Sequence, residues 1–575
     1  MSTSTQRKEK PVDILKTIRL RQTPQAPAAT PGQVRNAAGG YTFPVDDWAR
    51  VHRFLTLGTD GGTYYTADRE LTRDNAEVVL RVAATDPVGL VNRIVEVSEA
   101  GRAPKANPAL FALAIAASSE DVDGRRAALA ALPRVARTAT HLFLFAGYVE
   151  QFRGWGPTLR RAVSRWYTER PVDALAYQLV KYRQRGGWSH RDMLRLARPS
   201  GVVDPARRMA FNWAAGKGLG DYAEAPARLT DVELKVGQRT AVRPPVRAEV
   251  VPDELAIIAD FEDAQAASAA ARWIEIIGRG HGLSWEMLPD AALAQPAVWE
   301  ALIDRGMPQT ALMRQLPRLT RLGVLSGAVG DTVAEQLADR DRLVKARVHP
   351  VNVLVAQRTY TRGCGARGQA VWTPVAKISD ALDAAFYAAY GAVRPAYKRT
   401  LLALDVSGSM GSQVSGLPIS CREAAAALAM VTAATEPAHR IIGFTAGRGG
   451  HAQRAVSELD ISPRRRLDDV CRYTADLPFG ATDCALPMMW ALRRGVKVDT
   501  FHIYTDNETW YGSIHPHQAL AEYRHKMGID ARLVVVAMTA SGNSIADPAD
   551  PRQLDISGFD SAVPTLLADF SRGDI

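Results

Sequence analysis

The chain has 575 residues, 47% of them hydrophobic and 23% charged, a composition that predicts a folded protein of two or more domains. No apolar stretch is long enough to span a bilayer, the first ten residues lack the apolar core of a secretion signal, and the four cysteines show no Cys-x-x-Cys spacing. These features argue against a membrane span, a disulfide framework and a zinc site, and we expect a cytoplasmic protein.

The net charge of +10 is unevenly distributed along the chain. Residues 1–400 contain 55 Lys and Arg against 41 Asp and Glu, whereas residues 401–575 contain 16 against 20. A basic part joined to a mildly acidic part predicts a polyanionic partner, such as nucleic acid, for the basic part. A GC-rich genome would produce the same excess of arginine. The charge alone therefore does not decide between a nucleic-acid partner and an effect of genome composition.

Residues 1–34 are rich in Thr, Gln, Pro and basic side chains, and we expect them to form a flexible tail. From about residue 70 to 350, apolar positions recur every three or four residues between Pro or Gly breaks, which indicates short helices, as at 87–100. Because no such helix can bury its own apolar face, we expect stacked helix pairs of the HEAT-repeat type in a domain spanning residues 35–376.

The densest mixture of cations and aromatic residues lies between residues 179 and 198. The pattern predicts a helix end, a Gly-Gly turn and a new helix capped by Ser189, with Asp192 three positions later. Lys181 and Arg185 are four residues apart, and such cations bind phosphate groups. A solvated cationic face is the alternative interpretation. The candidate RNA contacts are Lys181, Arg183, Arg185, His190, Arg191, Arg195 and Arg198.

From residue 377 onward, strand-length apolar runs alternate with helical segments. We expect strands at 399–405, 498–505 and 531–538, and a helix at 421–435. This alternation predicts a doubly wound α/β domain covering residues 377–575.

An Asp-x-Ser-x-Ser loop follows the first of these strands, with Asp405, Ser407 and Ser409 supplying oxygen atoms. Thr482 lies in a later glycine-bearing loop, and Asp506 ends a second apolar run. In α/β folds such loops converge at the carboxyl edge of the sheet, where ligands bind. A lone copy of the pattern is usually a solvated turn. With all five oxygen residues in order we predict a divalent metal site, with Mg²⁺ as the expected ion.

Three groups of segments also carry a family resemblance. They are residues 36–43, 53–58 and 62–65; then 181–185, 187–190, 346–350 and 381–387; and finally 480–484, 505–509 and 545–548. Together they span nearly the whole chain after residue 35, and they resemble the TROVE domain and the von Willebrand factor A domain of the Ro autoantigen family, in its bacterial branch.

The resemblance implies a ring of HEAT-like helical repeats, closed by a von Willebrand factor A domain with a metal-ion-dependent adhesion site. It further implies binding of small noncoding Y-type RNA on the outer basic surface, through Lys181, Arg185 and Arg198. Single-stranded 3′ ends of misfolded or decaying RNA would enter the central hole, in RNA quality control or degradation. An exoribonuclease such as polynucleotide phosphorylase is an implied partner, and the ring is expected to be a monomer.

Two other functions stay open on the sequence. One is a metal-dependent adhesion scaffold, in which the α/β domain recruits a partner that supplies a carboxylate to the cation. The other is a metal-dependent nuclease, but two-metal nucleases need clustered carboxylates. The sequence also lacks P-loop, His-Glu-x-x-His and nucleophile-elbow motifs, so we expect no enzymatic activity.

Overall fold

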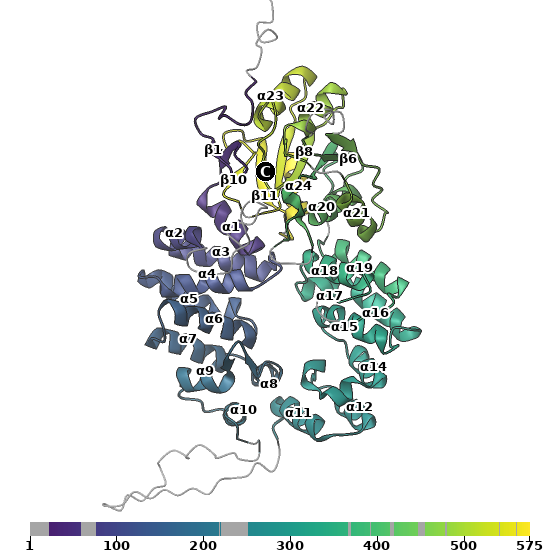
Figure 1. Ribbon diagram of the computed structural model, residues 1–575. Helices are drawn as coiled ribbons and strands as arrows, with labels where there is room; N and C mark the ends of the chain where they lie inside the picture. Colours follow the sequence, from purple (N-terminus) through teal and green to yellow (C-terminus); the bar gives the residue numbers. More distant parts are fainter. Residues whose placement is uncertain are drawn as a thin grey trace, which may run out of the picture.

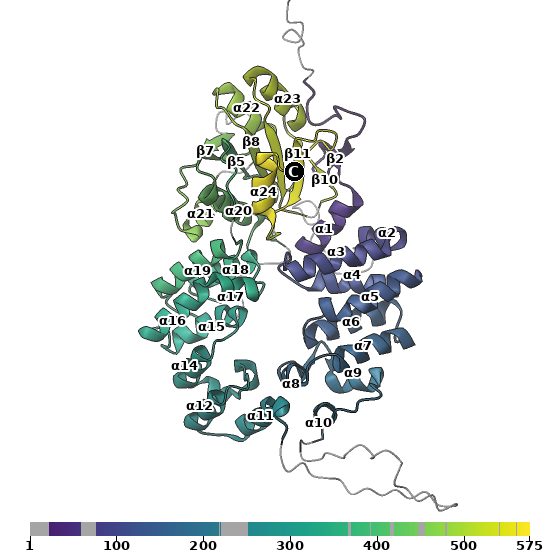
Figure 2. The same cartoon turned by 180° about the vertical axis from the view of Figure 1, so that it is seen from behind.

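The computed structural model describes residues 22–575 apart from 59–75, 218, 220–250, 366–369, 392, 415–418, 447–454, 478–479, 540 and 559. Two curved arms of stacked helices extend from an α/β domain and approach each other again at their far ends, so that the elements form a ring (Figure 1). The view from behind shows the same ring (Figure 2). The predicted combination of a helical repeat region and an α/β domain is confirmed.

The first arm consists of short helices whose starts are fixed by capping side chains. Asp46, Asp86, Asp121 and Thr138 each accept a hydrogen bond from a backbone NH of the helix that follows, which satisfies a donor that the helix itself leaves unpaired. Among the residues that the structure describes, no helix is long and apolar enough to cross a membrane. The helices of this arm are α1 (Asp47–Leu57), α2 (Glu77–Thr85), α3 (Pro87–Ala100), α4 (Asn107–Ser118), α5 (Val122–Val135), α6 (Ala139–Phe152), α7 (Pro157–Thr168), α8 (Val172–Lys181), α9 (His190–Ala197) and α10 (Pro205–Ala214).

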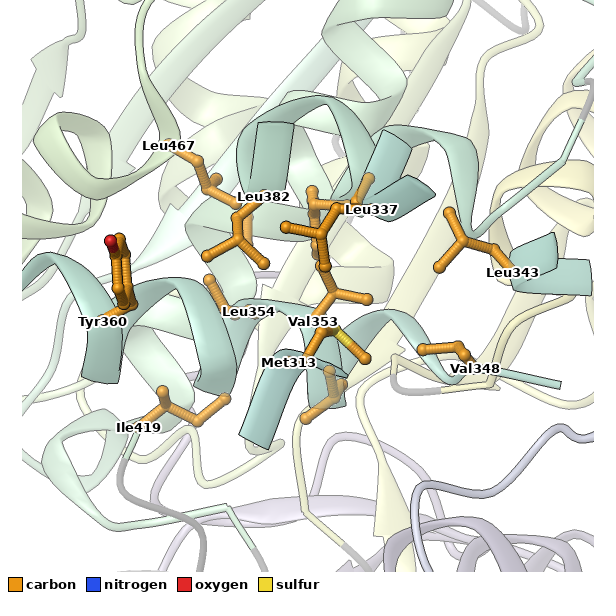
Figure 3. Close-up of a cluster of buried hydrophobic side chains, with 14 of the residues drawn as sticks. Met313, Leu337, Leu343, Val348, Val353, Leu354, Tyr360, Leu382, Ile419 and Leu467 are labelled. Carbon is orange, nitrogen blue, oxygen red and sulfur yellow. The ribbon is translucent and has the colours of Figure 1, made fainter. Parts of the chain in front are cut away.

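The second arm shares an apolar core with the α/β domain. Its elements are η4 (Asp253–Leu255), α11 (Ala256–Ala266), α12 (Ala270–Gly278), η5 (Trp285–Met287), α13 (Asp290–Leu293), α14 (Pro296–Asp304), α15 (Gln309–Arg321), α16 (Ala328–Ala338), α17 (Arg340–Lys345), α18 (Pro350–Thr361) and α19 (Ala376–Ala388). Figure 3 shows Leu354 and Tyr360 of α18 and Leu382 of α19 near Leu467 and Ile419 of the α/β domain. A hydrophobic interface therefore joins this arm to the α/β domain.

The α/β domain is built on a six-stranded sheet, whose strands are β5 (Thr400–Asp405), β6 (His439–Phe444), β7 (Val456–Glu458), β8 (Thr500–Thr505), β9 (Arg532–Ala537) and β11 (Gln553–Ser557). Its helices are η6 (Ser409–Gly411), α20 (Cys421–Thr435), α21 (Leu467–Ala475), α22 (Leu486–Arg493), α23 (Pro516–Met527) and α24 (Val563–Arg572). The strand order is β11-β9-β8-β5-β6-β7, and only β7 runs antiparallel to its neighbour. Leu402 and Leu404 of β5 pack with α20, while Leu401 and Ala403 face the core with α22 and α23. Helices thus cover both faces, as the doubly wound prediction requires.

The ring closes at two places. Beneath the α/β domain, Nε2 of His349 in the second arm lies 3.1 Å from the backbone carbonyl oxygen of Arg102 in the first. At the far end, α8 packs against η4 and α11, and Lys181 forms an ion pair with Glu286 across the junction, at 3.2 Å. Both closures join residues that lie far apart in the sequence.

A buried arginine ties the first arm to the α/β domain. Arg53 of α1 is only 1% exposed. Its guanidinium donates hydrogen bonds to the backbone carbonyls of Ser541 and Asn543 and forms an ion pair with Asp555 of β11. Because a buried guanidinium without partners would be costly, this residue fixes where α1 meets the α/β domain.

Residues 22–44 form a strap that lies along the α/β domain. Gln25 in this strap is fully buried. Its side-chain amide donates a hydrogen bond of 2.6 Å to Asp483, and its side-chain oxygen accepts one from Thr509. The strap ends in a three-stranded sheet made of β1 (Val34–Arg35), β2 (Tyr41–Pro44) and β10 (Asn543–Ser544).

The strap corrects one expectation about the N-terminus. Residues 22–34 are held by the α/β domain, although their composition predicts a flexible tail. Gly40 lies so close to this domain that a Cβ atom there would stand 2.0 Å from the carbonyl oxygen of Thr509. The other part of the predicted tail, residues 1–21, lies outside the described residues, as does the 62–65 motif.

Candidate functional site

The predicted basic segment folds as the end of α8, a tight hairpin and the start of α9. The hairpin pairs β3 (Gln184–Arg185) with β4 (Trp188–Ser189). Gly186 and Gly187 between them have φ angles of 56° and 81°, the left-handed conformation that a two-residue hairpin turn demands and glycine permits. Ser189 then caps α9 in the predicted capping box. The short hairpin brings the cations before and after the turn onto one part of the ring.

Five of the predicted RNA contacts are exposed arginines of this segment. Within the part of the chain that the structure describes, no carboxylate forms an ion pair with any of them. When an arginine forms no ion pair within the protein, its guanidinium NH groups remain available to an external anion. Two of these NH groups can donate parallel hydrogen bonds to the oxygens of one phosphate group. We call this group the arginine surface; it consists of Arg183, Arg185, Arg191, Arg195 and Arg198.

Lys181 lies beside the arginine surface but already has internal partners. Its Nζ donates a hydrogen bond of 2.9 Å to the hydroxyl of Tyr177, in addition to the ion pair with Glu286. Burial opposes the charge, but Tyr177, Tyr182 and Glu286 together raise the pKa of Lys181, so the ammonium group is charged at neutral pH. In this geometry Lys181 joins the two arms, and its contact with RNA stays a prediction.

His190 does not belong to the exposed surface. Its ring is only 2% exposed. Nδ1 lies 2.8 Å from the Tyr167 hydroxyl and Nε2 lies 3.2 Å from the carbonyl oxygen of Gln178. Burial lowers the pKa of His190 to about 4, so the imidazole is neutral. The structure therefore corrects this predicted contact, because the first residue of α9 turns inward to the core.

Two buried carboxylates mark the carboxyl edge of the sheet in the α/β domain. Asp405 ends β5 and Asp506 directly follows β8, its neighbour in the sheet. The Ser407 and Ser409 hydroxyl oxygens are 3.1 Å apart. Thr482 is also buried, on a loop that forms a backbone hydrogen bond with the loop of Ser407 and Ser409. The fold thus brings all five predicted metal-loop residues to one edge.

The charges of this edge fit a divalent cation. Burial raises the pKa of Asp405, and burial together with the charge of Asp405 raises that of Asp506. The oxygens of Asp405 accept hydrogen bonds from the Ser407 backbone NH at 2.9 Å and from the Thr505 hydroxyl at 2.7 Å. Oδ2 of Asp506, in contrast, is buried and has no hydrogen-bond partner among the residues that the structure describes. Mg²⁺ favours a few carboxylates combined with other oxygen ligands, and the residues present supply such a set.

Two residues around this edge escaped the sequence analysis. Thr505 directly precedes Asp506 at a strand end, a position from which its contact with Asp405 was foreseeable. The sequence does not indicate a contact for Gln25. Its partner Asp483 lies near the other end of the chain, and the composition of the strap is typical of a disordered segment. Burial raises the pKa of Asp483 to about 7, and Gln25 supplies one of its hydrogen bonds.

Comparisons with known proteins cover nearly the whole chain. Residues 34–359 match the family model of the TROVE domain, and residues 399–571 match that of the Ro60 vWA domain. A Caenorhabditis elegans protein, named RNA-binding protein RO60, is 37% identical over 95% of this chain and 91% of its own length. A Deinococcus radiodurans protein of the same name is 37% identical over 98% of this chain and its own full length. The crystal structure of the Deinococcus radiodurans Ro (RSR) protein matches with a TM-score of 0.66 and 36% identity, covering 92% of this chain and 100% of that one.

Proposed function

The chain belongs to the Ro family of TROVE-domain proteins, and from this premise we propose that it is a noncatalytic RNA-binding protein. The observation that carries the proposal is the arginine surface, five exposed guanidinium groups that form no ion pair within the described part of the chain. Two relatives named RNA-binding proteins support the same conclusion. Phosphate groups of RNA would supply the missing anions.

The proposal is tested by recovering the protein from its native cells and sequencing the RNA bound to it. We expect one or a few small structured RNAs to be enriched over total RNA. With the purified pair, the logarithm of the binding constant should fall linearly with the logarithm of the salt concentration, by about 0.7–0.9 for each phosphate contacted. Binding that does not respond to salt would contradict a phosphate-based interface.

The finer proposal names the RNA and its fate. We propose that a Y-type RNA binds the arginine surface, and that single-stranded 3′ ends of misfolded or decaying RNA enter the ring for quality control or degradation. The arrangement of the helices in a ring supports the second part (Figure 1), because a single strand needs a narrower opening than a folded RNA does. An exoribonuclease such as polynucleotide phosphorylase would be the degrading partner, since we propose that the protein itself is noncatalytic.

A second function is proposed for the α/β domain, namely metal-dependent adhesion. The observation that favours it is the Oδ2 atom of Asp506, which is buried beside Asp405 and has no hydrogen-bond partner among the described residues. Mg²⁺ would be held by Asp405, Ser407, Ser409, Thr482 and Asp506. The bound ion would provide a position for the carboxylate of a partner protein. RNA binding and adhesion use different parts of the molecule and are compatible.

An Asp506→Asn variant tests the metal proposal. In wild-type protein, millimolar Mg²⁺ should raise the thermal unfolding temperature, because a ligand that binds only the folded state stabilises it. The variant should lose this response. In EDTA it should unfold at the same or a higher temperature than wild type, since one of two buried like charges is gone.

The matched control is Asp476→Asn, which removes an exposed carboxylate from the same domain. It should keep the wild-type response to Mg²⁺. RNA affinity should be unchanged in both variants. A wild-type protein whose unfolding temperature ignores Mg²⁺ and Mn²⁺ would contradict the metal site.

A further inference from the structure

A polar cleft lies at the junction of the second arm with the α/β domain. Its volume is about 440 Å³, within the range of clefts that hold small ligands. It opens between α18 and α21, beside the α/β domain, whereas α8 and α9 lie toward the other end of the ring (Figure 1). The lining residues that matter here are Arg358, Thr359, Arg362, Asp468 and Arg472.

Two of the three arginines that line this cleft are available to a ligand. Arg362, directly after α18, is exposed and forms no ion pair within the parts of the chain that the structure describes. Arg472 of α21 pairs with Asp468 at 3.6 Å and with Asp469 at 3.2 Å. Its side chain is 66% exposed, and such exposed pairs are weak, so an incoming anion can compete for this guanidinium. The two arginines thus come from the two helices between which the cleft opens.

The third arginine connects the cleft to the support of the metal loop. Arg358 of α18 forms an ion pair with Glu423 of α20, and its side chain remains 37% exposed. The other carboxylate oxygen of Glu423 accepts a hydrogen bond of 2.9 Å from the backbone NH of Ser420, at the start of α20. The neighbouring Arg422 donates a hydrogen bond of 2.9 Å to the backbone carbonyl of Ser407. A ligand bound to Arg358 would therefore be linked through Glu423 to α20 and to the loop of Ser407.

The rest of the lining favours a compact anion over a nucleic acid. Among the described residues, no aromatic side chain lines the cleft, so no ring there would stack on a base. Asp468 lies in the wall and Asp469 follows it on α21, and both carboxylates would repel the phosphates of an extended strand. The hydroxyl of Thr359 has no hydrogen-bond partner within the described ranges, and it can donate to a phosphate group.

We propose that this cleft binds a small anion that carries two phosphate groups, held by Arg362 on one side and by Arg472 on the other. Guanidinium groups bind phosphate oxygens through paired hydrogen bonds, and two phosphates provide one such contact for each arginine. Arg358 adds a third positive charge beside them. A single carboxylate would neutralise only one of the three cations, and an apolar ligand would neutralise none. This site differs from the arginine surface in position and in ligand, and it does not depend on the proposed function.

The test measures the binding of pyrophosphate to the full chain by calorimetry, in EDTA so that the metal loop holds no ion. Wild-type protein should bind one pyrophosphate about 10-fold more tightly than inorganic phosphate, because only pyrophosphate offers a phosphate group to each arginine. Arg362→Gln should weaken the binding of pyrophosphate about 10-fold, through the loss of charged hydrogen bonds. Arg321→Gln is the matched control, since Arg321 also lies at the end of its helix, is exposed and forms no ion pair among the described residues. It should bind pyrophosphate as wild type does.

A second variant, Arg472→Gln, changes the other wall of the cleft and should weaken the binding of pyrophosphate by a similar factor. Arg185→Glu with Arg195→Glu, in the arginine surface, should leave this binding unchanged. A loss in the double variant as large as that in Arg362→Gln would place the anion on the arginine surface and overturn the proposal. Equal affinity for phosphate and pyrophosphate, or equal effects of Arg362→Gln and Arg321→Gln, would also overturn it. Each of these outcomes leaves the proposed binding of RNA intact, because RNA affinity is measured separately.

Discussion

Replacing Arg185 and Arg195 together by glutamate is expected to lower the affinity for RNA by about 100-fold or more near physiological salt. Each hydrogen bond to a charged group contributes roughly 1.5–3 kcal/mol, and the new carboxylates also repel phosphate. Both arginines are exposed and have no ion pair within the described residues, so the change breaks no internal contact between charges. The affinity is measured by titration, and the slope of its salt dependence should also fall, because fewer counterions are released.

The matched control is Arg493→Glu with Arg494→Glu in the α/β domain, which changes the net charge by the same amount far from the arginine surface. This pair should lower the affinity only slightly. An equal loss in both variants would show that net charge matters and the surface does not. Lys181→Glu is a poorer test, because it also places a second carboxylate beside Glu286, and a loss of affinity would then have two causes.

The elements of the α/β domain were predictable where local signals agree with the packing. The helix expected at 421–435 has these bounds in the structure, since Ser420 and Glu423 form a capping box at its start and its residues face the core. The strands expected at 399–405 and 498–505 are β5 and β8, each one or two residues shorter. The edge strand β7 was not expected, because an edge strand carries few of the alternating apolar residues that reveal a strand.

The sites were less predictable, because their chemistry depends on partners that are distant in sequence. The sequence shows that Arg185 carries a positive charge. It does not show that Lys181 forms an ion pair with Glu286 on the other arm. His190 follows the helix cap Ser189, and this position does not indicate which way the imidazole points. In the structure the imidazole lies in the core, where it is hydrogen-bonded to the Tyr167 hydroxyl and to the backbone carbonyl of Gln178. The convergence of the predicted metal-loop residues was predictable, because Asp405 ends β5 and Asp506 follows the neighbouring strand β8. Metal binding by these residues stays a prediction.

The contact of Arg53 with the α/β domain links the ring to the metal loop. Its guanidinium donates to the backbone carbonyl of Ser541, whose hydroxyl in turn donates a hydrogen bond of 3.3 Å to the carbonyl oxygen of Asp506. An Arg53→Met variant keeps most of the apolar volume but removes every donor of the guanidinium. It leaves Asp555 and two buried carbonyl groups without their partner, a loss of the kind that costs about 3–5 kcal/mol.

The expected result is therefore local opening between α1 and the α/β domain. In hydrogen exchange, backbone amides of residues 41–57 and 541–557 should exchange about 100-fold faster or more, while amides of α14, at a distance from this contact, should change little. Arg93→Met is the matched control, since Arg93 is more than a third exposed and pairs only with Glu96 among the described residues. If Arg53→Met also weakens the response to Mg²⁺, the position of the ring and the geometry of the metal loop are coupled through Ser541. If exchange accelerates equally in α14, the arginine stabilises the whole fold instead and no such coupling follows.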